Sequence, residues 1–231
     1  FIAGKKAYEV ERSLRFNDGD SPWLERTVSS SSNRRTFTIS VWVKRSTLAD
    51  GNIFGQTDTS GSYLFYMVFD SNSLYILDYD YPSNNYNFVT NRKFRDTSAW
   101  YHFVVTSDLT QATASNRVKF YVNGVQETSF STENYPSQNA SNAVPNFGNQ
   151  TIGVNIYNSS PSSNNYFNGY MAEVVFIDGQ ALDPTSFGKF DDDSPTIWKP
   201  KDVSGLTFGT NGFYLDFENA SSLGADVSGN S

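Results

Sequence analysis

The sequence predicts an all-β fold in which antiparallel strands pack as two face-to-face sheets or close into a barrel. Aromatic residues make up 16% of the 231 residues, with 19 Phe and 14 Tyr, and such side chains favour strands. Apolar runs of strand length recur between turn signals, and several alternate with polar residues. Charged residues amount to only 18%, so material for long amphipathic helices is scarce.

Seven runs predict the main strands of this fold, and two of the connections between them predict hairpins. Ser71–Asn72 is a two-residue connection, and Asn123–Gly124 is the strongest short hairpin signal because both residues tolerate a positive φ. The runs, in chain order, are Ser13–Phe16, Thr36–Arg45, Tyr63–Asp70, Ser73–Asp80, Trp100–Asp108, Val118–Thr128 and Gly169–Asp178.

Alternation along the second run predicts one face of the core. Phe37, Ile39, Val41 and Val43 recur at every second position, so they share one side of a strand. We expect this side to be buried and to be opposed by residues 118–122 and 172–176, which form two other predicted strands.

One predicted short helix and one change in amino-acid composition complete the predicted organisation of the chain. Asp183–Lys189 has Asp183 in the N-cap position and Pro184 at the first helical position, which predicts a helix. From about Phe190 the chain becomes acidic and carries one more strand-like run, Gly212–Glu218. We therefore expect a β-sandwich over residues 8–188 and a C-terminal extension over residues 189–231 that docks on it. The first and last residues suggest a piece, or a processed form, of a longer protein.

Composition excludes several classes of partner and site. The net charge of −7 and the absence of a clustered basic face argue against nucleic acid. Without cysteine there are no disulfides, thiolate metal sites or cysteine nucleophiles. No apolar stretch approaches the ~20 residues that span a bilayer.

The order of the motifs resembles the concanavalin A-like, laminin-G-like jelly-roll superfamily. The resemblance covers roughly Tyr8 to Gly188 and is carried by "SLRFNDGDSPWLERT", "TFTISVWVKRS", "AWYHFVVTSD", "RVKFYVNGVQ" and "YFNGYMAEVVFIDGQALDPTSFG". Three further segments resemble, more narrowly, domains of marine bacteriophage structural proteins: "DLTQATASNRVKFYVNG", "EVVFIDGQALDPTSFG" and "GTNGFYLDFENASSLGADVSGN". The resemblance implies a two-sheet antiparallel jelly-roll sandwich with one short helix.

The same resemblance implies a function, partners and a location. We expect a non-catalytic virion structural or adhesion domain, in a tail fibre, capsid fibre or decoration, with glycan binding and contact with other virion proteins as the two open roles. Its partners are then other virion proteins or host surface glycans, in a homo-oligomer or larger assembly, and its location is the virion, assembled in host cytoplasm. A secreted, extracellular lectin-like module and a glycan hydrolase of the same fold are the alternatives.

Glu173 is the residue that tests the hydrolase alternative. It lies in an apolar strand, and its nearest carboxylate there is Asp178, five residues on, so the two face opposite sides roughly 16 Å apart along the chain. Glycoside hydrolysis needs two carboxylates about 5–9.5 Å apart. Laminarinase-type relatives carry a Glu-x-Asp-x-Glu strand, which is absent from this sequence. We expect Glu173 to be structural and the protein not to be an enzyme.

The remaining acidic pairs and the single histidine give weaker signals. Asp18 and Asp20 flank a glycine in a turn, and two carboxylates with loop carbonyls could begin a calcium site; no other cofactor is expected. Asp78/Asp80 and Asp216/Glu218 have the parity of same-face pairs, and solvated strand charges explain the second pair. His102 lies on a predicted strand, and the chain has no Gly-x-Ser-x-Gly elbow that would supply a serine nucleophile. We therefore expect His102 to have a packing role.

Interleaved tyrosine and amide residues in two polar segments, Asp78–Asn87 and Asn155–Gly169, are the candidate contact residues. Rings that stack and amides that hydrogen-bond suit sugars, and they suit protein neighbours equally well. We place both segments in rim loops, where sandwiches carry recognition. The candidates are Tyr79, Tyr81, Asn84, Asn85, Tyr86, Tyr157 and Tyr166.

Overall fold

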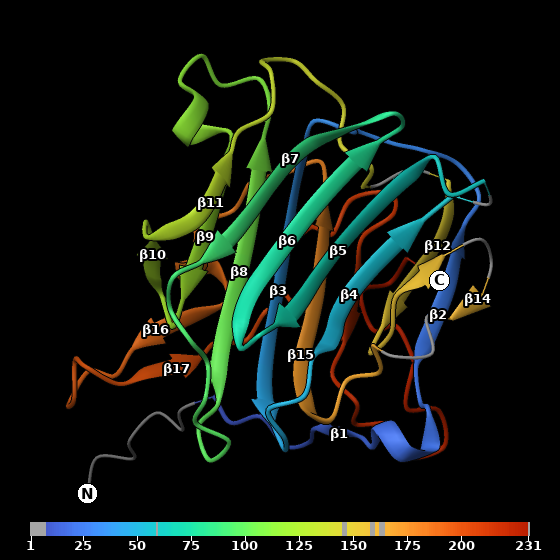
Figure 1. The fold of residues 1–231 in the computed structure, drawn as a ribbon. Helices are drawn as coiled ribbons and strands as arrows, with labels where there is room; N and C mark the ends of the chain where they lie inside the picture. The colour runs from blue at the N-terminus through green and yellow to red at the C-terminus, as the bar shows by residue number, and fades with distance from the viewer. Residues whose placement is uncertain (1–7, 59, 145–146, 158–159, 162–164, 231) are drawn as a thin grey trace, which may run out of the picture.

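The computed structural model describes residues 8–58, 60–144, 147–157, 160–161 and 165–230. It is nearly all β, and the described part contains two large antiparallel sheets packed as a sandwich (Figure 1). This confirms the predicted fold class. Helical structure in the described ranges is limited to three single-turn 3₁₀ helices, η1 (Asp18–Asp20), η2 (Ala114–Asn116) and η3 (Pro184–Ser186).

The sheet nearer the viewer in Figure 1, called the front sheet below, has seven strands in the order β11-β7-β6-β5-β4-β12-β2. Four of them form a continuous meander, so neighbours in sequence are neighbours in space. The strands are β2 (Leu24–Val28), β4 (Gly51–Thr57), β5 (Tyr63–Asp70), β6 (Ser73–Asp80), β7 (Ser83–Thr90), β11 (Phe130–Asn134) and β12 (Gly148–Ile152).

The second sheet, called the back sheet, has the order β1-β15-β3-β8-β9-β10, and β18 also pairs with β15. Its strands are β1 (Leu14–Phe16), β3 (Thr36–Arg45), β8 (Tyr101–Asp108), β9 (Val118–Val122), β10 (Val125–Glu127), β15 (Gly169–Asp178) and β18 (Phe213–Leu215). Two small ribbons complete the described structure, β13 (Ile156–Tyr157) with β14 (Ser160–Pro161), and β16 (Gly188–Phe190) with β17 (Trp198–Pro200).

Both predicted hairpins are confirmed. Ser71 and Asn72 have φ values of 50° and 66° between β5 and β6, and Asn123 and Gly124 have 50° and 78° between β9 and β10. Positive φ at both turn residues matches the right-handed twist of the strands that they join. The predicted cap at Asp183 is also present, since its carboxylate accepts a bond from the Thr185 amide, although the helix is a single 3₁₀ turn.

The core lies between the two sheets and is rich in phenylalanine. The predicted face of β3, Phe37 to Val43 at alternate positions, is fully buried in it. The rings of Phe37 and Phe65 meet edge to face at 5.7 Å, so β3 packs on the front sheet. The expected opposing strands were wrong: residues 118–122 and 172–176 lie in β9 and β15, in the same sheet as β3. Alternation shows which side of a strand is buried, and it does not show which strand covers that side.

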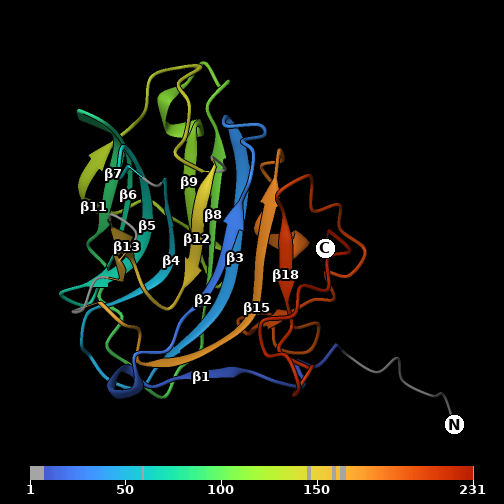
Figure 2. The ribbon, with the colours of Figure 1, turned by 90° about the vertical axis from the view of Figure 1, so that its right-hand side faces the viewer.

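The C-terminal extension covers the outer face of the back sheet, on the right in Figure 2. It also enters the sheet, because β18 pairs with β15, with Val175 opposite Tyr214. Phe213, Leu215 and Phe217 belong to the central core. Residues 189–231 therefore contribute a strand, core side chains and a cover. Their treatment as a separate docked unit stays a prediction.

Candidate functional site

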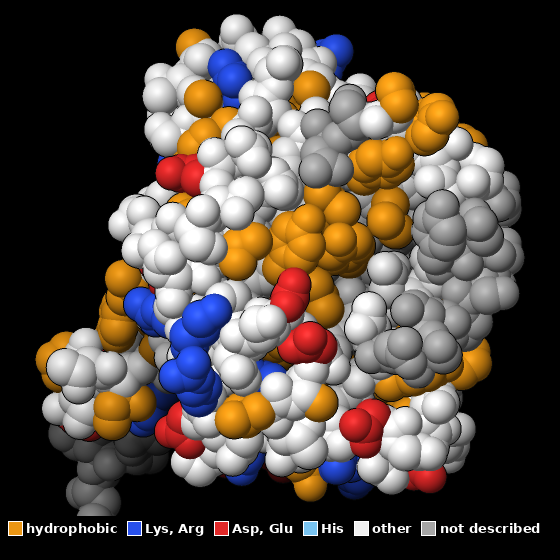
Figure 3. Space-filling view, in the orientation of Figure 1, with side chains coloured by type: hydrophobic (Ala, Val, Ile, Leu, Met, Phe, Trp, Pro, Cys, Tyr) orange, Lys and Arg blue, Asp and Glu red, His pale blue; other side chains and the backbone are white. Residues whose placement is uncertain are grey.

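The outer face of the front sheet carries a stripe of half-buried tyrosines with aliphatic side chains between them, of which Val68 and Leu77 are buried. On β5, Phe65 and Met67 point into the core, so the alternate residues Leu64, Tyr66 and Val68 face outward. On β6 the outward residues are Tyr75, Leu77 and Tyr79. We call these six residues the tyrosine face. Figure 3 shows hydrophobic side chains gathered over the middle of the front sheet, with acidic side chains beside them.

Tyr66 and Tyr75 form the centre of the tyrosine face. Their rings meet edge to face with centroids 5.4 Å apart, and their hydroxyls hydrogen-bond to each other. Burial raises the pKa of Tyr66 well above its ordinary value, and the hydrogen bond with Tyr75 is the second cause of the increase. The Tyr66 phenol is thus neutral at physiological pH, and both tyrosines present an apolar ring with a polar tip.

A pocket of about 250 Å³ opens beside these rings, at the beginning of β4 and the end of β5. Residues from five segments converge on it, since the chain segment after β12 folds over this end of the front sheet. The lining residues are Asp50, Asn52, Tyr66, Val68, Phe69, Asp70, Tyr75, Asn155 and Asn165.

The polar atoms of the pocket are mostly acceptors. Asn52 is fully buried; its Nδ2 donates to the Val154 carbonyl at 2.7 Å, and its Oδ1 has no partner. Asn155 Oδ1 is buried and unpartnered too. Asp50 Oδ1 accepts the Ser71 amide at 2.8 Å, which leaves the other carboxylate oxygen for a ligand.

Most of the contact residues predicted from sequence lie elsewhere. Residues 78–87 form the end of β6, a tight hairpin and the beginning of β7, so the predicted rim loop is wrong. Tyr86 is 0% exposed and packs on Phe88 in the core, and so it cannot contact a partner of the folded protein. Asn85 donates to Asp78 Oδ1 and to a backbone carbonyl, so its amide is used internally.

The other predicted contact residues are dispersed. Tyr79 is half-buried on the tyrosine face, and Tyr81 is 70% exposed at the hairpin tip. Tyr166 is half-buried against Trp23, with ring centroids 6.3 Å apart. The side chains of Asn84 and Tyr157 lie outside the described part of the chain. Among the predicted contact residues whose side chains are described, only Tyr79 lies on the tyrosine face.

Glu173 sits at a β-bulge on the back sheet. The register of β15 against β3 shifts between Ala172 and Val175, and Glu173 has a φ of 49°. Its Oε2 accepts hydrogen bonds from the hydroxyls of Tyr214 at 2.7 Å and Tyr8 at 2.9 Å. Burial raises the pKa of Glu173, and these two donors lower it. The carboxylate thus joins the N-terminal segment and the extension to the sheet.

His102 has the packing role that the sequence predicts. It is fully buried between Trp42, at 4.6 Å, and Trp198, at 6.0 Å, both stacked on the imidazole. Trp198 Nε1 donates to His102 Nδ1 at 2.9 Å, so Nε2 carries the proton and donates to Ser40 Oγ at 2.8 Å. Burial lowers the pKa of His102 to about 3, and the ring is neutral.

The acidic pairs are held by protein donors. Asp78 is fully buried, and burial raises its pKa to about 7 although it accepts bonds from Asn85 and the Ala143 amide. Asp18 accepts from Asn168 Nδ2, and Asp20 accepts from Asn17 Nδ2. No group of three or more Asp, Glu or His side chains is arranged for a metal within the described residues. Calcium binding at Asp18 and Asp20 stays a prediction.

Asp216 and Glu218 form the remaining pair. Asp216 Oδ1 accepts the Glu218 amide at 3.0 Å, a local turn contact in the extension. This agrees with the structural explanation that the sequence favours for the pair.

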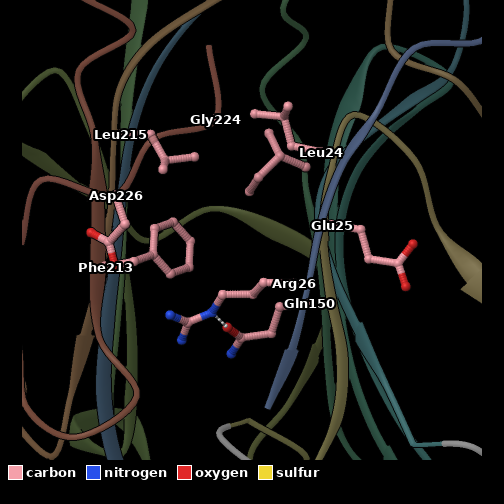
Figure 4. Close-up of a pocket in the computed structure, with 9 residues that line it drawn as sticks. Leu24, Glu25, Arg26, Gln150, Phe213, Leu215, Gly224 and Asp226 are labelled. Atoms are coloured by element: carbon pink, nitrogen blue, oxygen red, sulfur yellow. Dashed lines mark hydrogen bonds between the residues drawn. The ribbon is translucent and has the colours of Figure 1, made fainter. Parts of the chain in front are cut away.

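A second hollow, of about 130 Å³, lies in the open side of the sandwich between β2 and β18 (Figure 4). Its walls are apolar, from Leu24 on one sheet and Phe213 on the other. Arg26 Nε donates to Gln150 Oε1 at 2.8 Å, and the guanidinium lies 4.7 Å over the Phe213 ring. The side chains that line this hollow cover the side of the core. Because the Arg26 guanidinium is already bound to Gln150 and lies over Phe213, the hollow offers little to a charged ligand.

The comparisons with known proteins show the family. The profile of the concanavalin A-like lectin/glucanases superfamily, of laminin-G type, matches residues 18–186. The chain belongs to this superfamily. No curated protein matches it.

Solved structures of several proteins share this superfamily fold. The heptameric SAP-like pentraxin from Limulus polyphemus has a TM-score of 0.53 at 18% identity, covering 76% of this chain and 80% of that one. Mouse laminin α1 domains LG4-5 have a TM-score of 0.54 at 12% identity, over 80% and 48%. The NanB sialidase from Streptococcus pneumoniae has 0.51 at 16%, over 85% and 29%. These values establish the fold. In the described part, no helix is long and apolar enough to cross a membrane.

The sequence did not predict Tyr66, Tyr75, Asn52 or Asn155 as site residues. Both faces of β5 are apolar in sequence, with Phe65 and Met67 on one side and Tyr66 and Val68 on the other, so alternation cannot show which side is open. The one available signal is that three of the four tyrosines of β5 and β6, Tyr66, Tyr75 and Tyr79, share a side, while Tyr63 lies on the side of the phenylalanines.

Proposed function

We propose that this domain binds glycans, without catalysis, through the tyrosine face and the adjoining pocket. The observation that carries the proposal is the combination of half-buried tyrosine rings with unpaired amide oxygens in one concave site. Sugar rings present apolar C–H faces and hydroxyl edges, which fit aromatic surfaces flanked by a few fixed polar groups. Membership of a lectin and glucanase superfamily supports the same function.

The carboxylates of the site support the proposed absence of catalysis. Asp50 and Asp70 line the pocket, and Asp50 is already bonded to the Ser71 amide. Asp78, the acid with the clearly raised pKa on this sheet, points into the core on β6 and is fully buried. A glycosidase needs a protonated and an ionised carboxyl group on the two sides of one bond. An enzyme of the same fold remains the competing function, and release of reducing ends from polysaccharides would demonstrate it.

The larger context that we propose is a virion. The motif resemblance to marine bacteriophage structural proteins supports a fibre or decoration domain that binds host surface glycans as part of a homo-oligomer or larger assembly. The expected location is therefore the virion, and a secreted module is the alternative. Labelling purified particles with an antibody against the domain, followed by electron microscopy, tests this context directly.

Glycan binding is tested with one double variant and one control. Tyr66→Ala/Tyr75→Ala removes the two central rings, and Tyr170→Ala removes an exposed ring from β15 on the other sheet. On a glycan array we expect wild type and Tyr170→Ala to bind the same glycans, and the double variant to lose at least about tenfold in affinity. Equal binding by the double variant, with a cooperative melting transition, would contradict the proposal.

A further inference from the structure

The pocket beside the tyrosine face has an excess of hydrogen-bond acceptors. Asn52 uses its amide nitrogen on the Val154 carbonyl and leaves its oxygen unpaired at 0% exposure. Asn155 leaves a second buried amide oxygen unpaired. Asp50 and Asp70 add two carboxylates to the same lining. A buried acceptor without a donor is unfavourable, so this pocket favours a ligand that brings several donors.

The two cations near the pocket in the described part of the chain, Lys93 and Arg45, are engaged elsewhere. Lys93 Nζ donates to the Ser71 carbonyl, and the Arg45 guanidinium donates to the carbonyls of Ala49 and Phe94. Neither cation lines the pocket. The Tyr66 and Tyr75 hydroxyls hydrogen-bond each other, so one phenolic proton of the pair remains for a ligand. A ligand carboxylate would therefore face the Asp50 and Asp70 carboxylates, and none of the described lining residues is a cation that could neutralise it.

The size of the pocket fits one sugar unit. Its volume of about 250 Å³ is below the ~300–1,000 Å³ of sites that enclose drug-sized ligands. A longer chain must then continue from the pocket across the tyrosine face, over Leu77 and Tyr79 on β6. The pocket sets the chemistry of one unit, and the open face accepts its neighbours.

We infer that this pocket selects a glycan unit rich in hydroxyl or amino donors and excludes carboxylated sugars, an inference that rests on the proposed glycan binding. Ligand hydroxyl or ammonium groups donate to the free carboxylate oxygens of Asp50 and Asp70, and to Asn52 Oδ1 and Asn155 Oδ1, which have no partner in the free protein. The pyranose face lies against the rings of Tyr66 and Tyr75. Uronic and sialic acids place acceptors against acceptors and are rejected.

The test begins with an array of neutral, amino and carboxylated glycans, probed with wild type in buffer that contains EDTA. The strongest signal defines a matched set on one sugar backbone: the neutral oligomer, its amino form and its uronic form, at equal length. We expect the neutral and amino forms to bind at least about tenfold more tightly than the uronic form. The same array is repeated in buffer without EDTA. Binding that is present without EDTA and lost with EDTA would overturn the inference, because a cation would then occupy these oxygens.

Variants of the two more accessible lining residues identify the pocket. Asn155→Leu removes an acceptor, and we expect about tenfold weaker binding of the neutral form; Asn155→Asp keeps an acceptor oxygen and retains binding. Asp70, which is exposed, is replaced as Asp70→Lys, and we expect the preference against the uronic form to shrink or reverse. Asp80→Asn, on β6 outside the pocket lining, is the control without effect.

The outcomes separate this inference from the function on which it rests. If the uronic form binds as well as the neutral form, or if Asn155→Leu binds like wild type while Tyr66→Ala/Tyr75→Ala does not bind, the pocket assignment is wrong and glycan binding stands. If no glycan on the array binds to wild type, both the proposed function and the inference fail.

Discussion

The outer faces of the two sheets carry similar residues, but the C-terminal extension covers the outer face of the back sheet and not that of the front sheet. Each presents aromatic rings beside polar groups: Tyr66 and Tyr75 on the front sheet, Trp42 and His102 on the back sheet. On the back sheet, the extension places Trp198 over them and completes every hydrogen bond of the imidazole. On the front sheet the rings stay half-buried, and neighbouring amide oxygens stay unpaired. The fully bonded face stabilises the fold, and the incompletely bonded face is the one that we propose binds a ligand.

The largest effect should come from uncovering the back sheet. Trp198→Ala removes the ring that packs on His102 and donates to it, and the cavity should cost about 3–5 kcal/mol of unfolding free energy. Trp100→Ala, with 36% of the side chain exposed, is the matched control and should change stability far less. Urea titration of both variants gives the comparison, and similar losses would mean that the cover contributes little.

A matched pair of Tyr→Phe changes compares single hydroxyls on the two faces. Tyr214→Phe removes a donor to the buried Glu173 carboxylate and should cost about 1.5–3 kcal/mol. Tyr66→Phe removes a hydroxyl that bonds to another phenol at a half-buried position and should cost about 0.5–1.5 kcal/mol. Thermal denaturation of the two variants under one condition measures the difference. A larger loss for Tyr66→Phe would reverse the contrast between a covered and an open face.

The pH dependence of stability also distinguishes the two sheets, because one buried group on each sheet changes the free energy of unfolding with pH, and the two changes have opposite signs. The pKa of His102 falls from 6.5 to about 3 on folding, so the unfolded state takes up a proton first as the pH falls below 6.5, and stability decreases. The pKa of Asp78 rises from 3.8 to about 7, so its contribution is fully present below 3.8 and is lost as the pH rises to 7. The two effects oppose each other between about pH 4 and 6.5.

Single variants reveal these opposing slopes. Relative to His102→Gln, wild type should lose about 1.4 kcal/mol for each unit by which the pH falls below 6.5. Relative to Asp78→Asn, wild type should gain stability over the same fall in pH, by a similar slope. Denaturant titrations from pH 4 to 7 give both difference curves. Parallel curves for wild type and His102→Gln would show that the imidazole titrates normally in the folded protein.

The sequence by itself determined the strands, the turns and the fold class. Thr36–Arg45, Tyr63–Asp70, Ser73–Asp80 and Gly169–Asp178 become β3, β5, β6 and β15 with the predicted bounds. Local rules suffice for this: alternation sets the strand period, and turn residues that tolerate a positive φ set the hairpins. The buried side of β3 is local information of the same kind.

Only the tertiary structure decided which strands oppose each other, which outer face is covered, and where polar groups lack partners. Tyr86 resembles a surface tyrosine in sequence and is buried, because it lies opposite the inward residue Asp78 and shares the core side of β7 with Phe88. Asn52 and Asn155 are about a hundred residues apart, and they meet because β12 pairs with β4 and leads its following segment onto the outer face. Such contacts depend on long-range pairing, which local propensity does not encode, so the fold was predictable from the sequence and the site was not.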